Sequence, residues 1–113
     1  MFHEEMQSCI DACVSCAQEC ERCAEACLEE KDIRSLAECM RLDRDCADMC
    51  WTAAGLMSRS SHFAHDACRV CAEICDTCAG ECAKHEMDHC QRCAEACRTC
   101  AEECRRMAAA AAA

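Results

Sequence analysis

Small apolar residues recur along this chain at alternating steps of three and four positions, with polar residues between them. The recurring residue is usually cysteine, and alanine commonly lies beside it. Such steps place side chains on one face of an α-helix, at the a and d positions of a heptad, whereas a strand would need a period of two. The pattern therefore predicts amphipathic helices along the chain and no strands.

The cysteines fall into four runs, and each run predicts one helix. The runs are Cys9, Cys13, Cys16, Cys20, Cys23 and Cys27; Cys39, Cys46 and Cys50; Cys68, Cys71, Cys75, Cys78 and Cys82; and Cys90, Cys93, Cys97, Cys100 and Cys104. Segments without the pattern separate the runs. We expect helices near residues 4–29, 33–57, 61–84 and 87–107.

Short polar segments join the predicted helices. Asp32 is the expected N-cap of the second helix, and Ser60 or Ser61 that of the third. Because short connections make neighbouring helices antiparallel, we predict an all-α fold, an up-down antiparallel four-helix bundle with a cysteine-lined core. Residues 1–113 should form a single domain, with residues 108–113 as a helix extension or a frayed tail.

Composition and charge narrow the class of protein. The chain starts without the basic and apolar regions of a signal peptide, and no apolar run reaches the roughly 20 residues that span a bilayer. We therefore expect a cytoplasmic protein, in which thiols stay reduced and cysteine clusters indicate metal binding. The net charge of −10 argues against nucleic acid and anionic membranes as partners.

A core of 19 cysteines needs an explanation, because leucine would bury more apolar area. Free cysteine packs as a small hydrophobe, but its use at nearly every core position sacrifices burial worth about 25 cal/mol per Å². Disulfides between successive helical turns close tiny loops and stabilise little, and cross-bundle disulfides need specific geometry at every layer. A ligand that fills the interior is therefore the better interpretation.

Cu(I) is the metal that suits these thiols best. Zinc prefers discrete tetrahedral sets, and iron–sulfur clusters use cysteines on loops, whereas Cu(I) accepts two or three thiolates. All 19 cysteines are thus candidate ligands to multiple Cu(I) ions. If every thiolate bridges two coppers, the capacity is about 19 ions per chain. If each copper instead has two thiolates that it does not share, the capacity is about 9. The motif C-A-x-x-C supports this reading and begins at Cys16, Cys23, Cys46, Cys71, Cys78, Cys93 and Cys100.

These features closely resemble the bacterial copper storage proteins, particularly their cytosolic branch. The resemblance rests on the four cysteine runs, the C-A-x-x-C repeats and the lack of a signal peptide, and it covers about residues 3–107. It implies a bundle, commonly a homotetramer, that holds many Cu(I) ions for protection against copper toxicity or for supply. A copper chaperone or copper enzyme would be the donor or recipient. The second helix, with three cysteines, departs from the full pattern.

Three further residues are candidate ligands at one end of the bundle. Asp43 lies between Cys39 and Cys46, near the position where the second run lacks a cysteine. His85 continues the third run, and His89 lies four residues before Cys93. Together they could form a mouth through which copper enters, although exposed residues beside a turn would have the same spacing.

The other end and the outer faces carry weaker signals. Met6, Met57 and Met107 continue their runs, with His3 and His65 nearby; packing explains such methionines more often than metal ligation does. Large apolar residues remain for the outer faces, where they favour association between subunits: Leu42, Trp51, Leu56 and Phe63.

Other functions are weighed against copper storage. One is a general soft-metal buffer for zinc or cadmium, resembling a metallothionein in role. Another is a thiol redox protein, which would need a distinctive low-pKa cysteine that the pattern does not single out. The sequence contains no recognisable catalytic set or phosphate-binding loop, and we predict that the protein is not an enzyme.

Overall fold

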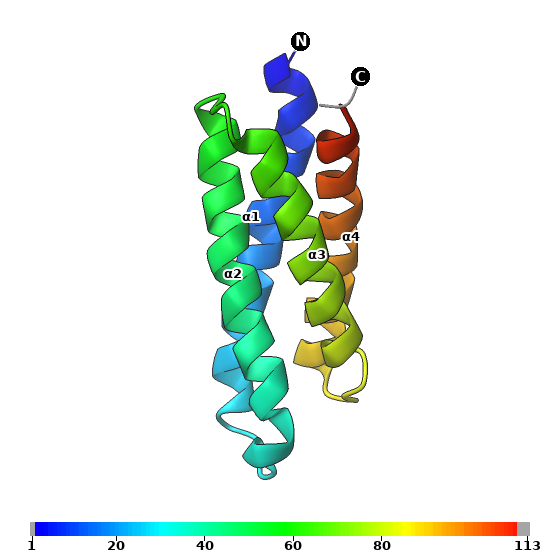
Figure 1. Cartoon of the computed structure of the whole chain (residues 1–113). Coiled ribbons are helices and arrows are strands. Elements are labelled where there is room, and N and C mark those ends of the chain that lie inside the picture. The colour runs from blue at the N-terminus through cyan, green and yellow to red at the C-terminus, as the bar shows by residue number, and fades with distance from the viewer. Residues whose placement is uncertain (1, 111–113) are drawn as a thin grey trace.

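The fold is a bundle of helices that follows the cysteine runs. The computed structural model describes residues 2–110, and the side chains of residues 6–110. Its helices are α1 (Phe2–Cys27), α2 (Ala37–Ser58), α3 (Ala64–Cys82) and α4 (Asp88–Ala110), with a short 3₁₀ helix, η1 (Ile33–Leu36), before α2. They run up and down in a body of 48 × 20 × 18 Å (Figure 1). The predicted all-α bundle is confirmed.

Helices that are adjacent in sequence pack against each other, and α1 also packs against α4, which closes the bundle. The start of α1, the end of α4 and the α2–α3 turn lie at one end (Figure 1). The α1–α2 connection and the α3–α4 turn lie at the other. Over residues 2–110, no helix is both long enough and apolar enough to cross a membrane.

The start of α2 differs from the prediction. Asp32 precedes η1 rather than α2, and its side chain makes no capping hydrogen bond. Its backbone carbonyl instead accepts hydrogen bonds from the hydroxyl and the backbone N–H of Ser35, at 2.8 and 3.2 Å. Because these contacts tighten the chain into a 3₁₀ turn, α2 itself begins later, after Leu36.

The predicted cap of α3 is also wrong. The helix begins after Phe63, not near residue 61. Ser60 has a φ of 52°, in the left-handed region that ends a helix rather than starting one. The hydroxyl of Ser61 accepts a hydrogen bond from the backbone N–H of Phe63 at 3.1 Å, which forms a local turn. At the far end of the chain, α4 extends to Ala110, and residues 111–113 lie outside the described part.

The interior consists almost wholly of sulfur and methyl groups. Among the described residues, the buried side chains are cysteines and alanines, together with Met6, Leu36, Asp43, Met57 and Met107. Leu42 and Leu56, which we expected on the outer faces, are partly buried and pack against this core. Trp51 and Phe63 remain exposed, as predicted.

Candidate metal centre

All 19 cysteines are free thiols with no exposed surface. Helices α1, α3 and α4 present them at steps of three and four residues, so successive thiols point to the bundle axis from successive turns, and α2 has one step of seven, from Cys39 to Cys46. Neighbouring Sγ atoms lie 3.4 to 4.0 Å apart. The result is a column of sulfur atoms along the axis of the bundle.

Contacts between helices join most of this column. In the middle of the bundle, Cys46 of α2 lies 3.8 Å from Cys16 of α1 and 3.5 Å from Cys75 of α3. It also lies 3.9 Å from Cys97 of α4, so the four helices meet through one thiol. Twelve cysteines are linked in this way by sulfur–sulfur contacts within 4.0 Å: Cys9, Cys13, Cys16, Cys20, Cys46, Cys50, Cys71, Cys75, Cys93, Cys97, Cys100 and Cys104.

The spacing of these sulfur atoms suits metal ions. Several sets of four thiols have all their Sγ atoms within 4.8 Å of one another, for example Cys16, Cys20, Cys46 and Cys97. A metal with thiolate bonds of about 2.3 Å can bridge sulfur atoms up to about 4.6 Å apart. Neighbouring sets share members, so the thiols do not divide into separate tetrahedral sites. This overlap favours bridging thiolates.

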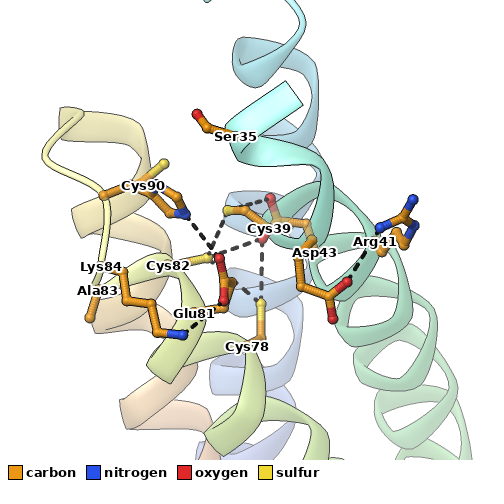
Figure 2. Close-up of polar contacts among 12 residues, drawn as sticks. Ser35, Cys39, Arg41, Asp43, Cys78, Glu81, Cys82, Ala83, Lys84 and Cys90 are labelled. Carbon is orange, nitrogen blue, oxygen red and sulfur yellow. Dashed lines mark hydrogen bonds and ion pairs between the residues drawn. The ribbon is translucent and has the colours of Figure 1, made fainter. Parts of the chain in front are cut away.

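Asp43 occupies the position where the cysteine pattern of α2 is interrupted. It has no exposed surface and is the one carboxyl group in the described core. The thiols of Cys78, Cys82 and Cys93 donate to its Oδ1 atom at 3.4, 3.4 and 3.1 Å. Figure 2 shows the carboxylate of α2 facing Cys78 and Cys82 of α3. Asp43 therefore connects Cys39, Cys78 and Cys82 to the column through Cys93.

The environment of Asp43 favours its neutral form. Burial raises the pKa of its carboxyl group from 3.8 to about 9, and the neighbouring Cys93 and Cys39 add to the increase. Burial likewise raises the pKa of the Cys27 thiol to about 11. In the metal-free protein these groups thus keep their protons at neutral pH.

The end of the bundle formed by the α1–α2 connection and the α3–α4 turn is here called the histidine end. The two histidines predicted as ligands, His85 and His89, both lie there, but they have different partners. Nδ1 of His89 lies 3.4 Å from Sγ of Cys23 and 3.6 Å from Sγ of Cys90. His85 instead pairs through Nε2 with Glu81 at 3.0 Å, and no thiol lies within hydrogen-bonding distance among the described residues. Of the two, only His89 is already beside the thiols.

Two carboxylates that sequence reasoning missed hold these rings. Nε2 of His89 lies 2.9 Å from Oε2 of Glu30, which comes from the segment after α1. Glu81 lies four residues before His85 on α3, and the hydrogen bond between them lowers the pKa of Glu81. The i, i+4 spacing could have revealed the second pair. No sequence signal connects Glu30 with His89, which are 59 residues apart.

The opposite end, here called the methionine end, carries the remaining candidates. Met6, Met57 and Met107 are buried there. Nδ1 of His65 lies 2.7 Å from the backbone carbonyl oxygen of Met107. His3 lies outside the residues whose side chains are described.

Comparisons with known proteins agree with this geometry. The family model described as copper storage protein matches residues 2–109. The Bacillus subtilis (strain 168) protein described as the uncharacterised cysteine-rich protein YhjQ is 50% identical over 103 residues, which are 91% of this chain and 95% of that protein.

Solved structures are similar over nearly their whole length. The Cu(I)-bound copper storage protein BsCsp3 is 49% identical, with a TM-score of 0.89 over 92% of this chain and 98% of that one. A cytosolic copper storage protein from Streptomyces lividans, loaded with five coppers, is 40% identical, with a TM-score of 0.92 over 96% of this chain and 95% of that one. The resemblance drawn from the cysteine pattern is thus confirmed, and this chain belongs to the copper storage protein family.

Proposed function

We propose that this chain, acting as a single four-helix domain, stores about 19 Cu(I) ions as thiolate complexes inside the bundle, in the cytoplasm. The observation that carries the proposal is the column of buried thiols with sulfur–sulfur spacings of 3.4 to 4.0 Å. A core designed only for packing would contain larger apolar side chains. Storage serves copper sequestration, detoxification or supply.

Charge balance favours one copper for each thiolate. Buried thiolates without counter-ions would repel one another strongly, whereas one Cu(I) for each thiolate leaves the interior nearly neutral. Because the Cys27 thiol has its pKa raised to about 11 by burial, copper must displace its proton. Loading therefore exchanges protons for Cu(I) ions and leaves the charge of the core almost unchanged.

Non-cysteine ligands complete the proposed site at the histidine end. His89 presents Nδ1 to two thiols and is a ligand for a copper shared with Cys23 or Cys90. Asp43 ligates copper near Cys78, Cys82 and Cys93, since all three thiols approach its Oδ1 atom. His85 takes part after its ring leaves Glu81. The proposed ligand set is thus the 19 cysteines with Asp43, His85 and His89.

The finer predictions on assembly and partners belong to the same proposal. Phe63 and Trp51 are 67% and 41% exposed, which supports burial of these side chains in a homotetramer. The cytosolic description of the Streptomyces lividans relative supports the cytoplasmic location. A copper chaperone or a copper enzyme is the proposed donor or recipient.

Anaerobic titration of the reduced protein with Cu(I), in the presence of a competing chelator, tests the proposal. We expect saturation near 19 ions per chain. Saturation near 9 would contradict bridging thiolates, and four or fewer would contradict storage. The same titration after preloading with zinc tests the soft-metal buffer, because Cu(I) should expel zinc completely if copper is the cargo.

A further inference from the structure

Three methionines continue the cysteine pattern at the methionine end, where α1 starts, α4 ends and the α2–α3 turn lies (Figure 1). Met6 lies three residues before Cys9 on α1, and Met107 three residues after Cys104 on α4. Met57 lies seven residues after Cys50 on α2. All three are buried: Met6 and Met57 have no exposed surface, and Met107 is 6% exposed. Packing alone would account for this burial.

Met57 differs from the other two in its contact with a thiol. Its Sδ atom lies 3.6 Å from Sγ of Cys68, the first cysteine of α3. That distance falls within the 3.4 to 4.0 Å range of the thiol–thiol contacts in the column. Over residues 6–110, neither Met6 nor Met107 makes a hydrogen-bonding sulfur contact of this kind. Met57 therefore places a second sulfur atom beside Cys68, and packing does not require that placement.

We propose that Met57 is a copper ligand, and that its thioether and the Cys68 thiolate together bind one Cu(I) ion. The inference rests on the proposed storage of copper in the thiol column. Cysteine and methionine are the side chains whose sulfur atoms select Cu(I) over harder metals. On binding, the Cys68 S–H bond breaks, the proton leaves to solvent, and two Cu–S bonds form. No electron is transferred.

The distance between the two sulfur atoms fits this coordination. If both Cu–S bonds are about 2.3 Å long, donors 3.6 Å apart subtend an angle of roughly 103° at the metal. This angle is nearer to trigonal than to linear geometry and leaves room for a third donor.

A neutral donor also suits the surroundings. One Cu(I) ion and one thiolate cancel in charge, and a thioether adds none, so the site costs little to bury. The end is closed by buried side chains, and the ring of His65 on α3 is tied to the Met107 carbonyl on α4 at 2.7 Å. A second thiolate bound to this copper alone, in place of the thioether, would leave a net negative charge in the same buried apolar surroundings.

Selenium-edge X-ray absorption of the selenomethionine-labelled, Cu(I)-saturated protein tests the site directly. The chain has seven methionines, so we expect about one seventh of the selenium atoms to show a copper neighbour at bonding distance. Met57→Leu should abolish that signal, and the matched control Met6→Leu should retain it. Both variants are checked for copper content and helicity before measurement.

Other results would overturn the inference. A saturated wild-type protein without a selenium–copper contact contradicts it, whether or not Met57→Leu folds. A contact that survives in folded Met57→Leu assigns the ligand to another methionine and also contradicts it. Failure of the proposed function is distinguishable, because such a protein would not take up copper in the preceding titration.

Discussion

Nε2 of His89 lies 2.9 Å from Oε2 of Glu30. A carboxylate at this distance holds the proton on Nε2 and leaves the lone pair on Nδ1, the nitrogen that faces Cys23 and Cys90. The bond also joins the segment after α1 to the first turn of α4. Glu30 thus orients the imidazole with Nδ1 toward the thiols, which suits the proposed role of His89 as a copper ligand.

Removal of Glu30 should therefore weaken copper binding at the proposed His89 site. We expect Glu30→Ala to lower Cu(I) affinity at the histidine end about 10- to 100-fold, the usual cost of losing an outer partner of a ligating histidine. Glu30→Gln should lose less, because its amide oxygen still accepts from Nε2–H. Chelator competition at low copper loading measures the affinity, and ¹⁵N NMR of the imidazole reports the tautomer.

The control for this prediction is Glu29→Gln, which changes an exposed carboxylate one residue away. It should leave both the affinity and the tautomer unchanged. Equal losses in Glu29→Gln and Glu30→Ala would point to general electrostatic attraction of copper and contradict a positioning role.

The reduced, metal-free protein should already be helical. Its buried thiols pack as small apolar groups, and their partners are alanines with high helix propensity. Far-UV circular dichroism before and after anaerobic loading with Cu(I) measures the change. We expect nearly equal helical signals and a higher unfolding temperature after loading, since copper binds only the folded core. A coil spectrum without copper would disprove a preformed site.

The sequence predicted the fold well because a single rule, steps of three and four between cysteines, controls both helix formation and burial. The same rule placed Asp43 near the column, since Cys39, Asp43, Cys46 and Cys50 continue the alternation. It could not distinguish Met57 from Met6 or Met107, because spacing determines the face of a helix but not the distance between two sulfur atoms. Nor could it find Glu30, whose partner is remote in sequence.

Local turns were predicted less well for a different reason. Asp32, Ser60 and Ser61 all favour N-caps by residue type. Backbone contacts decided the outcome, through a 3₁₀ turn before α2 and a left-handed residue before α3. These differences shift helix starts by a few residues and do not move any cysteine out of the core.

Association of subunits should depend on the exposed aromatic side chains. Phe63, at the α2–α3 turn, is 67% exposed. We expect Phe63→Glu to lower the sedimentation mass of the assembly at micromolar concentration, because a charge is costly to bury at an apolar interface. Val70→Thr, a milder change at a side chain that is 36% exposed, serves as a comparison. A wild-type mass equal to the 12.5 kDa monomer would contradict the homotetramer.

The stability of the metal-free protein should fall as pH rises through the neutral range, in part because of Asp43. Its ordinary pKa of 3.8 is raised to about 9 by burial, so the native state keeps a proton that the unfolded chain has released. Wherever the native state binds the additional proton, the free energy of unfolding decreases with increasing pH. This loss of stability occurs between about pH 4 and about pH 9. Below about pH 4 the carboxyl group carries its proton in both the native and the unfolded state, so the stability no longer depends on its ionisation.

Asp43→Asn isolates this contribution, because an amide has similar shape and does not titrate. Denaturant unfolding of both proteins, reduced and free of metal, gives the free energy of unfolding between pH 5 and 8. The free energy of unfolding should fall more steeply with pH in the wild type than in Asp43→Asn, by up to about 1.4 kcal/mol per pH unit, which is the value for one proton. Parallel slopes would mean that Asp43 is ionised in the folded core, and its thiol neighbours would then have to stabilise a buried charge.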